Sequence, residues 1–373
     1  MDWNDLQRLA PSMSTPCYVY DLKKLRSAVA SFRACFGSED KLLYATMANP
    51  RTTIVSEVVG GGFGVFVNSL SHLAVATETQ PTPGMISFAA SGLSSDALQQ
   101  VASSAATFCA DSLAQLDSYL RFRPSGLLGI RINVGWLLGD DSDPAPRLGL
   151  AGNEVREARA SSRQLEILHV YLGTNLLTED MYLSAISGLS DLALDLGGIS
   201  HIDVGGGLAI APNSEGGRLL CQRVANAWQQ TKAFQEHIKL ILEPGRAVVK
   251  ESGSLFVTVT DTKIRGGHQF ITVDTSGTWY PRTMIHGATD HWVNVAGASS
   301  RGPREVLPSS ICGCTTYSKD FLAHLGLPRV WPGTVLEFSS AGAYCESMHL
   351  DFLGVGRPSC WFVDEGVVYA VDD

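Results

Sequence analysis

The segment Lys41-Leu42-Leu43-Tyr44-Ala45-Thr46-Met47-Ala48-Asn49-Pro50 contains an apolar run that ends in a turn of small residues. This pattern predicts a buried strand that delivers one side chain, that of Met47, to the mouth of a barrel. The position is a candidate for a residue that takes part in chemistry. Methionine has no amine, so Met47 can neither form an imine nor carry a proton.

Short apolar runs alternate with helical periods from residue 15 to about residue 250. Helices are predicted between the runs, for example over residues 22–36 and 112–122. Such alternation is typical of parallel βα units, and about eight of them predict a (β/α)8 TIM-type barrel. The predicted strands are residues 17–20, 42–45, 64–67, 85–88, 107–110, 127–133, 165–172, 201–204 and 240–242.

The sequence pattern changes after about residue 250. Glycine and proline punctuate short apolar runs there, and little helical period remains. A β-rich domain is therefore predicted to follow the barrel. Its predicted strands are residues 254–261, 269–274, 334–338 and 361–363.

Composition excludes several classes of protein. The 373 residues are 45% hydrophobic, carry a net charge of −9 and contain no basic run, which argues against nucleic-acid binding. The N-terminus lacks the pattern of a signal peptide, and no apolar stretch reaches the ~18 residues that span a bilayer. We therefore expect a cytoplasmic protein without membrane contact.

The eight cysteines are scattered along the chain, which favours reduced thiols over a disulfide framework. Cys312-Gly313-Cys314 is too tight for the usual Cys-x-x-Cys zinc knuckle, and no His/Cys pair stands nearby at metal spacing. No metal site is expected.

Two further segments have the composition of an anion site. His201-Ile202-Asp203-Val204-Gly205-Gly206-Gly207 is a strand that ends in three glycines, whose N–H groups can approach a phosphate closely. Ile241-Leu242-Glu243-Pro244-Gly245-Arg246 follows one helix later and adds a carboxylate and a guanidinium. A plain turn and a surface salt bridge are the simpler interpretations of each segment alone.

Together these segments resemble the motifs of the fold-type III pyridoxal 5′-phosphate (PLP) decarboxylases. This family is similar to ornithine and diaminopimelate decarboxylases and has an alanine-racemase-like barrel. The stretch from Tyr44 to Asn49 matches its Tyr-Ala-x-Lys-Ala-Asn motif, and the stretch from Glu243 to Arg246 matches Glu-Pro-Gly-Arg. The resemblance implies a barrel over residues 20–252, and a β-rich domain made of residues 1–19 and 253–373.

The resemblance also implies roles. Met47 stands where the family has the lysine that forms the Schiff base with PLP, and Glu243 stands where a glutamate pairs with the protonated pyridine nitrogen. Tyr171 would stack on the ring, although many members have histidine there. The residues implied at the cofactor are Arg131, Tyr171, Thr174, Gly205, Gly206, Gly207, Glu243, Gly245, Arg246 and Tyr344.

The segment from Cys312 to Asp320 resembles a loop that, in the family, reaches into the active site of the partner subunit. A shared-site homodimer is therefore implied. The usual catalytic cysteine falls on Thr316 and the usual aspartate on Tyr317, while Cys314 could replace the cysteine as a proton relay or could be a structural thiol. That aspartate grips a distal ammonium, so Tyr317 argues against free ornithine, lysine or arginine as substrate.

Phe66 is a further departure. It stands nineteen residues after Met47, where the family often has an aspartate near the lysine. With Met47 present, PLP could be held without a covalent bond or could enter as a preformed external aldimine with an amino acid. Turnover is expected to fall by orders of magnitude, because the nucleophile that forms and releases the aldimine is missing.

Three interpretations remain open. The chain is a PLP-dependent decarboxylase of an amino acid or a conjugated amino acid, as in natural-product or siderophore biosynthesis, inactivated or trapped by Met47. Alternatively, it is a naturally lysine-less homologue that acts as a binding or regulatory protein, or that uses the pocket without PLP. A racemase ranks last, because racemases of this fold differ in the Glu-Pro-Gly-Arg motif.

Overall fold

The computed structural model describes residues 3–104, 106–139, 145–281, 292–296 and 305–371. Eight parallel strands form a closed barrel, in which the first strand pairs with the last. The predicted TIM-type barrel is thus confirmed. The strands are β2 (Lys41–Ala45), β3 (Gly64–Val67), β4 (Ile86–Phe88), β5 (Thr107–Ala110), β6 (Leu128–Ile132), β7 (Leu165–Val170), β8 (His201–Asp203) and β9 (Lys239–Leu242).

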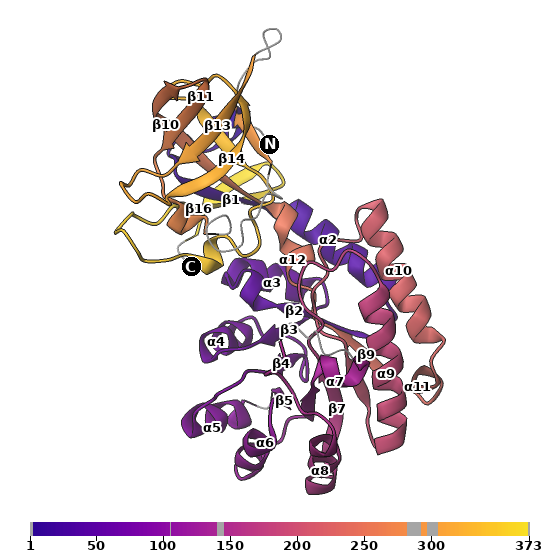
Figure 1. The fold of residues 1–373 in the computed structure, drawn as a ribbon. Helices are drawn as coiled ribbons and strands as arrows, with labels where there is room; N and C mark the ends of the chain where they lie inside the picture. The colour runs from indigo at the N-terminus through magenta and orange to yellow at the C-terminus, as the bar shows by residue number, and fades with distance from the viewer. Residues whose placement is uncertain (1–2, 105, 140–144, 282–291, 297–304, 372–373) are drawn as a thin grey trace. The chain divides into compact units, whose positions relative to one another are not determined.

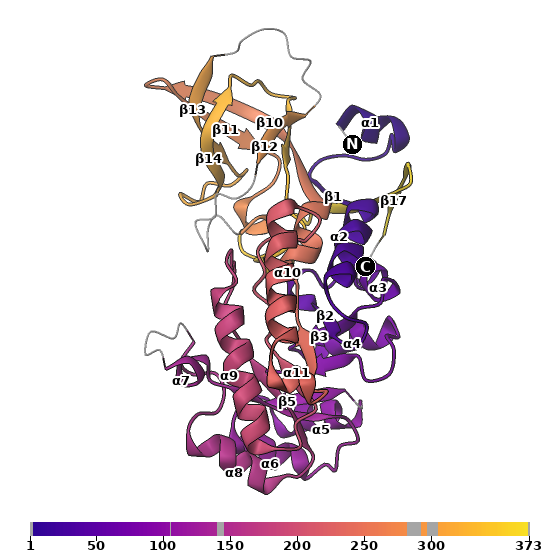
Figure 2. The same ribbon diagram turned by 90° about the vertical axis from the view of Figure 1, so that its right-hand side faces the viewer.

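Helices surround these strands, and α9 and α10 lie alongside each other (Figures 1 and 2). Serine hydroxyls at Ser69, Ser94, Ser112 and Ser214 accept the N–H three residues later, so each satisfies one free donor of a helix start. The helices are α2 (Leu22–Cys35), α3 (Thr52–Gly60), α4 (Leu70–Glu78), α5 (Ser95–Ser103), α6 (Leu113–Leu120), α7 (Val134–Leu138), α8 (Asn153–Ser161), α9 (Asp180–Leu196), α10 (Glu215–Gln229), α11 (Lys232–Gln235) and α12 (Arg246–Val249).

The rest of the chain is rich in strands, as predicted. A nine-stranded sheet runs in the order β14-β13-β11-β10-β1-β16-β17, with β15 paired to β10 and β12 paired to β15. Its first strand comes from the N-terminus and pairs with β10 and β16. The strands are β1 (Cys17–Asp21), β10 (Gly253–Arg265), β11 (His268–Val273), β12 (Val293–Ala296), β13 (Val306–Cys312), β14 (Phe321–Pro328), β15 (Val335–Phe338), β16 (Ser359–Asp364) and β17 (Val367–Ala370).

Sequence patterns missed four of these strands, β12, β13, β14 and β17. Pro308 lies within β13, and Gly326 lies within β14, so neither run has the composition of a strand. In β12 and β17 the side chains are mostly exposed or half-buried, which gives no apolar alternation. The predicted strand at 254–261 was too short, since β10 continues to Arg265.

The remaining short elements are a helix at the N-terminus and four 3-10 turns, α1 (Trp3–Leu9), η1 (Thr46–Ala48), η2 (Lys250–Ser252), η3 (Gly277–Trp279) and η4 (Glu346–Met348). By its internal contacts the chain divides into two compact units. The barrel unit is Arg26–Val248, and the β-rich unit is Met1–Leu25 with Val249–Asp373. None of the helices among the described residues is long and apolar enough to cross a bilayer.

Side chains from the barrel strands fill the interior of the barrel. A buried cluster joins Leu43, Ala45, Phe66, Ala89, Cys109, Ile167 and Ile241, and Met47, Met85 and Leu127 pack against it. The neighbours of Gly129 in β6 leave no room for a side chain at this position. A Cβ there would lie 2.7 Å from Cys109 Sγ and 2.9 Å from Ile167 Cβ.

Gly129→Ala is therefore expected to lower the free energy of unfolding by about 1–3 kcal/mol through overpacking. Thermal unfolding of the variant and the wild type measures this difference. Gly60→Ala is the matched control, because a Cβ on Gly60 of α3 meets nothing within 4 Å. That variant should be neutral or slightly stabilising. Equal effects of the two substitutions would contradict the packing described for β6.

Candidate functional site

Three polar side chains occupy one level on adjacent barrel strands. Arg131 of β6 is in register with His169 of β7, and His169 is in register with Asp203 of β8. Ile167, two residues before His169, belongs to the interior cluster, so the pleat directs His169 to the interior as well. Glu243 follows β9 and is two residues beyond Ile241, another member of that cluster.

Arg131 is held between two neighbours. Its Nη1 donates to Asp111 Oδ1 at 2.9 Å, and its Nε donates to His169 Nδ1 at 3.3 Å. Asp111 also accepts the Gly149 N–H at 3.1 Å and the Ser91 hydroxyl. The arginine and aspartate side chains are only 9% and 8% exposed, so this is a buried ion pair whose charges offset each other.

His169 is neutral and has a fixed tautomer. Because Nδ1 accepts from Arg131, the ring proton is on Nε2, which lies 3.5 Å from Glu243 Oε2. Burial lowers the pKa of His169 to about 4. The ring also stacks on Phe66, with centroids 6.1 Å apart.

Asp203 and Glu243 are two buried carboxyl groups that lie close together. One donor atom each of His169, Asp203 and Glu243 lies within 4.8 Å of the others. Burial raises the pKa of Glu243 to about 8. Burial, and then the neighbouring Glu243, raise the pKa of Asp203 well above its ordinary value. Two such groups cannot both ionise without a cation.

The three glycines after β8 pack tightly against neighbouring strand ends. Gly205 and Gly207 have positive φ angles of 68° and 96°, and a Cβ on Gly206 would lie 2.4 Å from the Glu243 carbonyl oxygen. The Gly205 N–H donates to Asp203 Oδ1 at 2.9 Å. Within the described part of the chain, the N–H groups of Gly206 and Gly207 donate to no protein group, so they are available to an anion.

Tyr171 and Thr174 lie beside this glycine turn. Tyr171 follows β7, is 39% exposed, and has its Cα 3.8 Å from the position of a Cβ on Gly205. Thr174 is exposed and follows Gly173, whose carbonyl oxygen lies 2.8 Å from the position of a Cβ on Gly207. Both predicted residues are thus next to the triplet.

The Met47 segment lies against the end of β9. The Ala45 N–H donates to the Pro244 carbonyl at 3.3 Å, and a Cβ on Gly245 would lie 3.0 Å from Ala45 Cβ. Arg246 follows Gly245 and begins α12. The ends of β2, β7, β8 and β9 therefore gather the predicted barrel residues at one rim, since parallel strands share their carboxyl ends.

No lysine of the barrel unit stands at this rim. Lys41 and Lys239 begin β2 and β9, at the opposite end of the barrel, and Lys232 is the first residue of α11. Met47, which is half-buried, lies in the 3-10 turn η1 just after β2, at the position predicted from the motif to correspond to a lysine. No other amine of the barrel unit can take its place.

Cys314, Tyr317 and Tyr344 belong to the β-rich unit. Cys314 is exposed, and partial burial raises the pKa of its thiol above the ordinary value, which disfavours the reactive thiolate. Tyr317 is 37% exposed, and its ring meets that of Phe352 edge-on at 5.5 Å. Tyr344 is half-buried and has a positive φ of 54°.

Asp320 anchors the loop that carries Tyr317. Its Oδ1 accepts from the Ser276 hydroxyl at 2.9 Å and the Gly277 N–H at 2.7 Å. Its Oδ2 accepts from both the N–H and the hydroxyl of Thr315. Asp320 is 3% exposed, so this carboxylate is used by the protein itself.

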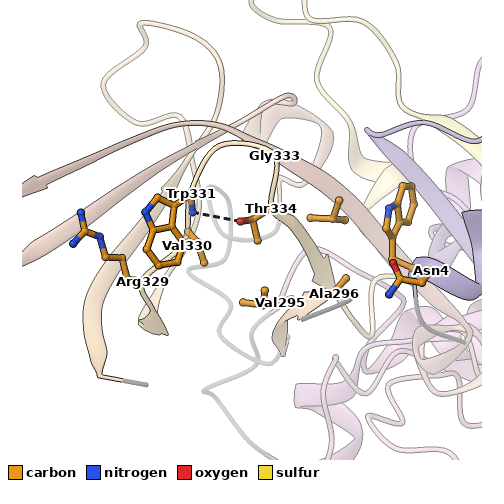
Figure 3. A pocket seen from close by; sticks show the side chains of 10 residues that line it. Asn4, Val295, Ala296, Arg329, Val330, Trp331, Gly333 and Thr334 are labelled. Atoms are coloured by element: carbon orange, nitrogen blue, oxygen red, sulfur yellow. Dashed lines mark hydrogen bonds between the residues drawn. The ribbon is translucent and has the colours of Figure 1, made fainter. Parts of the chain in front are cut away.

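A separate pocket of about 490 Å³ opens in the β-rich unit (Figure 3). Arg329 lies over the Trp331 ring, 5.7 Å from its centroid, and the Trp331 N–H donates to Thr334 Oγ1 at 3.3 Å. None of the predicted site residues lines this pocket. Its lining residues are Trp3, Asn4, Val295, Ala296, Arg329, Val330, Trp331, Gly333, Thr334 and Val335.

Four residues with polar contacts in the structure had no role predicted from the sequence, namely Asp111, His169, Asp203 and Asp320. The first three could have been found, because each is a polar residue at an inward position in or just after an apolar run. Asp320 had no such signal, since its partners at residues 276, 277 and 315 are fixed only by the tertiary fold.

The barrel rim fits a phosphorylated pyridine. Glu243 Oε1, which is buried, receives no hydrogen bond from the described residues, and so it can accept from a ring nitrogen. The glycine turn offers free N–H groups to a phosphate. When bound, PLP supplies an electron-accepting ring that stabilises negative charge on the substrate α-carbon.

Comparison with known proteins agrees with this geometry. Residues 22–250 match the family described as pyridoxal-dependent decarboxylase, pyridoxal binding domain. The chain belongs to this family. By family and fold it is a PLP-dependent amino-acid decarboxylase, and PLP is its cofactor.

The similar proteins are diaminopimelate decarboxylases. That of Archaeoglobus fulgidus is 26% identical over 371 residues, which cover 93% of this chain and 86% of that protein. That of Aquifex aeolicus is 28% identical over 387 residues, which cover 97% and 90%.

Solved structures share the fold. Diaminopimelate decarboxylase from Helicobacter pylori complexed with L-lysine has a TM-score of 0.84 at 22% identity and covers 98% of this chain and 95% of its own. The arginine decarboxylase of Paramecium bursaria Chlorella virus bound to agmatine has a TM-score of 0.85 at 20% identity, covering 96% and 99%.

The raised pKa of Glu243 predicts that the unliganded protein loses stability as pH rises from 6.5 to 8. Glu243 has a pKa of about 8 when folded, against an ordinary 4.5, so the folded chain binds one more proton in this range. The free energy of unfolding should then fall by up to about 1.4 kcal/mol per pH unit. Asp203 adds to the fall, whereas His169 acts with opposite sign only below pH 6.5.

Urea unfolding across this pH range tests the expectation. Glu243→Gln should flatten the decline, and Glu215→Gln, an exposed glutamate of α10, should leave it unchanged. An equally steep decline in Glu243→Gln would show that the decline does not come from Glu243.

Proposed function

We propose that this chain binds PLP at the barrel rim and that its substrate is an amino acid without a free distal ammonium. The class that fits is a conjugated amino acid, as in natural-product or siderophore biosynthesis, which would lose its α-carboxylate. The proposal includes a homodimer in which the loop bearing Tyr317 contributes to the partner's site.

The observation that carries the substrate class is the chemistry of this loop. Its one carboxylate, Asp320, is buried and already accepts bonds to both oxygens, so it has no capacity to bind a ligand ammonium. The exposed surface is instead aromatic, formed by Tyr317 and Phe352, which are 37% and 54% exposed. Aromatic edges suit a neutral or acylated side chain better than a diamine.

We assign roles to the rim residues on the same basis. Glu243 would accept the ring N–H, Tyr171 would stack on the ring, and Arg131 would hold His169 beneath it. The N–H groups of Gly206 and Gly207 would bind the phosphate. Of the other predicted residues of the barrel, Thr174, Gly245 and Arg246 would also hold the phosphate.

Met47 then limits turnover rather than binding. Its thioether fills the space of a lysine stem but has no amine, so it cannot hold the cofactor covalently or release product by exchange. In this form the protein would retain the cofactor or a trapped complex, with a rate reduced by orders of magnitude.

A second candidate is a naturally lysine-less binding or regulatory protein. Met47 packs against the cluster that contains Phe66, so an apolar contact stands where an ammonium and a carboxylate would otherwise be expected. Replacement of a buried ion pair by apolar groups of similar volume is often neutral or stabilising. The contact of Met47 with the cluster that contains Phe66 therefore supports a protein that has evolved without the lysine.

Restoring the amine separates the two candidates. Met47→Lys, alone and with Phe66→Asp, would be mixed with PLP and followed by visible absorbance, borohydride trapping and CO₂ release. For a decarboxylase, a reducible adduct and CO₂ release are expected from Met47→Lys, and the double variant should be faster. Met85→Lys is the matched control, because Met85 packs on the same cluster but precedes β4, at the other end of the barrel.

PLP uptake without CO₂ release in both lysine variants would favour the binding protein. Failure of every form to take up PLP would show a repurposed pocket.

The loop predicts a change of specificity. In the Met47→Lys background, Tyr317→Asp should raise kcat/KM for free diamino acids, relative to their distal N-acyl derivatives, by about ten-fold or more. Tyr317→Phe keeps the ring and should leave the ratio within about two-fold. Diaminopimelate, ornithine and Nδ-acetylornithine form a suitable panel. If Tyr317→Asp leaves this ratio of kcat/KM values unchanged, the loop does not select the substrate.

A further inference from the structure

Asp203 and Glu243 share a buried environment in which one oxygen of each carboxyl group finds no donor among the described residues. Asp203 is fully buried and Glu243 is 5% exposed. Asp203 Oδ1 accepts the Gly205 N–H at 2.9 Å, whereas Asp203 Oδ2 and Glu243 Oε1 receive no hydrogen bond from the described residues. A buried carboxyl oxygen without a donor is costly, so a donor is required here.

The charged neighbours do not supply one. Arg131 donates to Asp111 and to His169, and its charge is offset by Asp111. His169 is neutral and donates at most one weak bond, since its Nε2 lies 3.5 Å from Glu243 Oε2. Lys41 donates instead to the Gly84 carbonyl at 3.4 Å. Cys109, the remaining titratable group beneath them, is kept as a thiol because burial raises its pKa.

We propose that Asp203 is a positioning residue that carries a proton at neutral pH and donates it to Glu243, and that this bond holds Glu243 as a carboxylate once a protonated ring nitrogen is bound beside it. A proton on one carboxyl is the only donor that the pair can provide for itself. The geometry favours Asp203 as the holder, because its Oδ1 already accepts the Gly205 N–H and its Oδ2, which has no donor, is left to carry the proton.

Asp203 thereby joins the two ends of the cofactor pocket. Its Oδ1 accepts the Gly205 N–H at the start of the glycine turn, and its carboxyl group lies beside that of Glu243 at the ring-nitrogen end. The Glu243 N–H in turn donates to the Gly205 carbonyl at 2.8 Å. This inference rests on PLP as the cofactor but not on the proposed substrate.

Infrared spectroscopy of the unliganded protein is the first test. A carboxylic-acid C=O band is expected at pH 7, unchanged in Asp191→Asn, an exposed aspartate of α9, and absent in the double variant Asp203→Asn/Glu243→Gln. Absence of the band from the wild type would overturn the proposal. Its appearance only after a chelator is added would also overturn it, since a cation would then join the two carboxyl groups.

Pyridoxine 5′-phosphate, which has the ring and phosphate but no aldehyde, tests the assignment to Asp203. In the saturated wild type the band should persist, and in Asp203→Asn it should be lost. A band that survives in Asp203→Asn would place the proton on Glu243 and overturn the assignment.

Affinity separates positioning from a purely structural role. Asp203→Asn keeps an N–H donor for Glu243 and should bind pyridoxine 5′-phosphate within about three-fold of the wild type. Asp203→Leu removes the donor and should weaken binding by about ten-fold or more, with partial recovery as pH rises and Glu243 ionises. A pH-independent loss in Asp203→Leu would indicate only structural damage. If no form binds the ligand, the cofactor assignment fails, while the infrared result on the unliganded pair still stands.

Discussion

The ion pair of Arg131 and Asp111 sets the charge of the whole barrel rim. Because the arginine donates its hydrogen bonds to Asp111 and His169, its charge only partly offsets the effect of burial on Glu243, whose pKa stays raised. His169 stays neutral because it is buried and because its Nδ1 accepts a hydrogen bond from the Arg131 guanidinium. Along the rim, a satisfied ion pair on one side is separated by the neutral His169 from two carboxyl groups on the other, and that second side is where a ring cation fits.

Much of the barrel could be predicted from sequence, because each buried strand is a short apolar run followed by a turn. The rim could be predicted in part. The glycine triplet and Glu243 stand in recognisable motifs, whereas the bonding of Arg131 to His169 depends on the register between β6 and β7. Register across parallel strands is set by helices and loops far apart in sequence, so a motif cannot reveal it.

The β-rich unit was harder to predict for a related reason. β14 is only partly buried, and β13 includes a proline, so neither strand has the alternation that marks a half-buried sheet. Their pairing is decided by tertiary contact instead. The bonds of Asp320 are a local example, since they tie a loop at residue 315 to a turn at residues 276 and 277.

Those bonds have a consequence for how the family diversifies. The bonds that hold this loop are made by the inward side chain of Asp320, and the outward side chain of Tyr317 takes no part in them. The loop can therefore keep its shape when its outward side chains change. Tyr317 is exposed and contacts only the Phe352 ring among the described aromatic groups, so substitutions there should leave folding almost untouched. If this loop selects the substrate as proposed, specificity can change there while the scaffold stays constant, so the evolution of specificity is separated from that of stability.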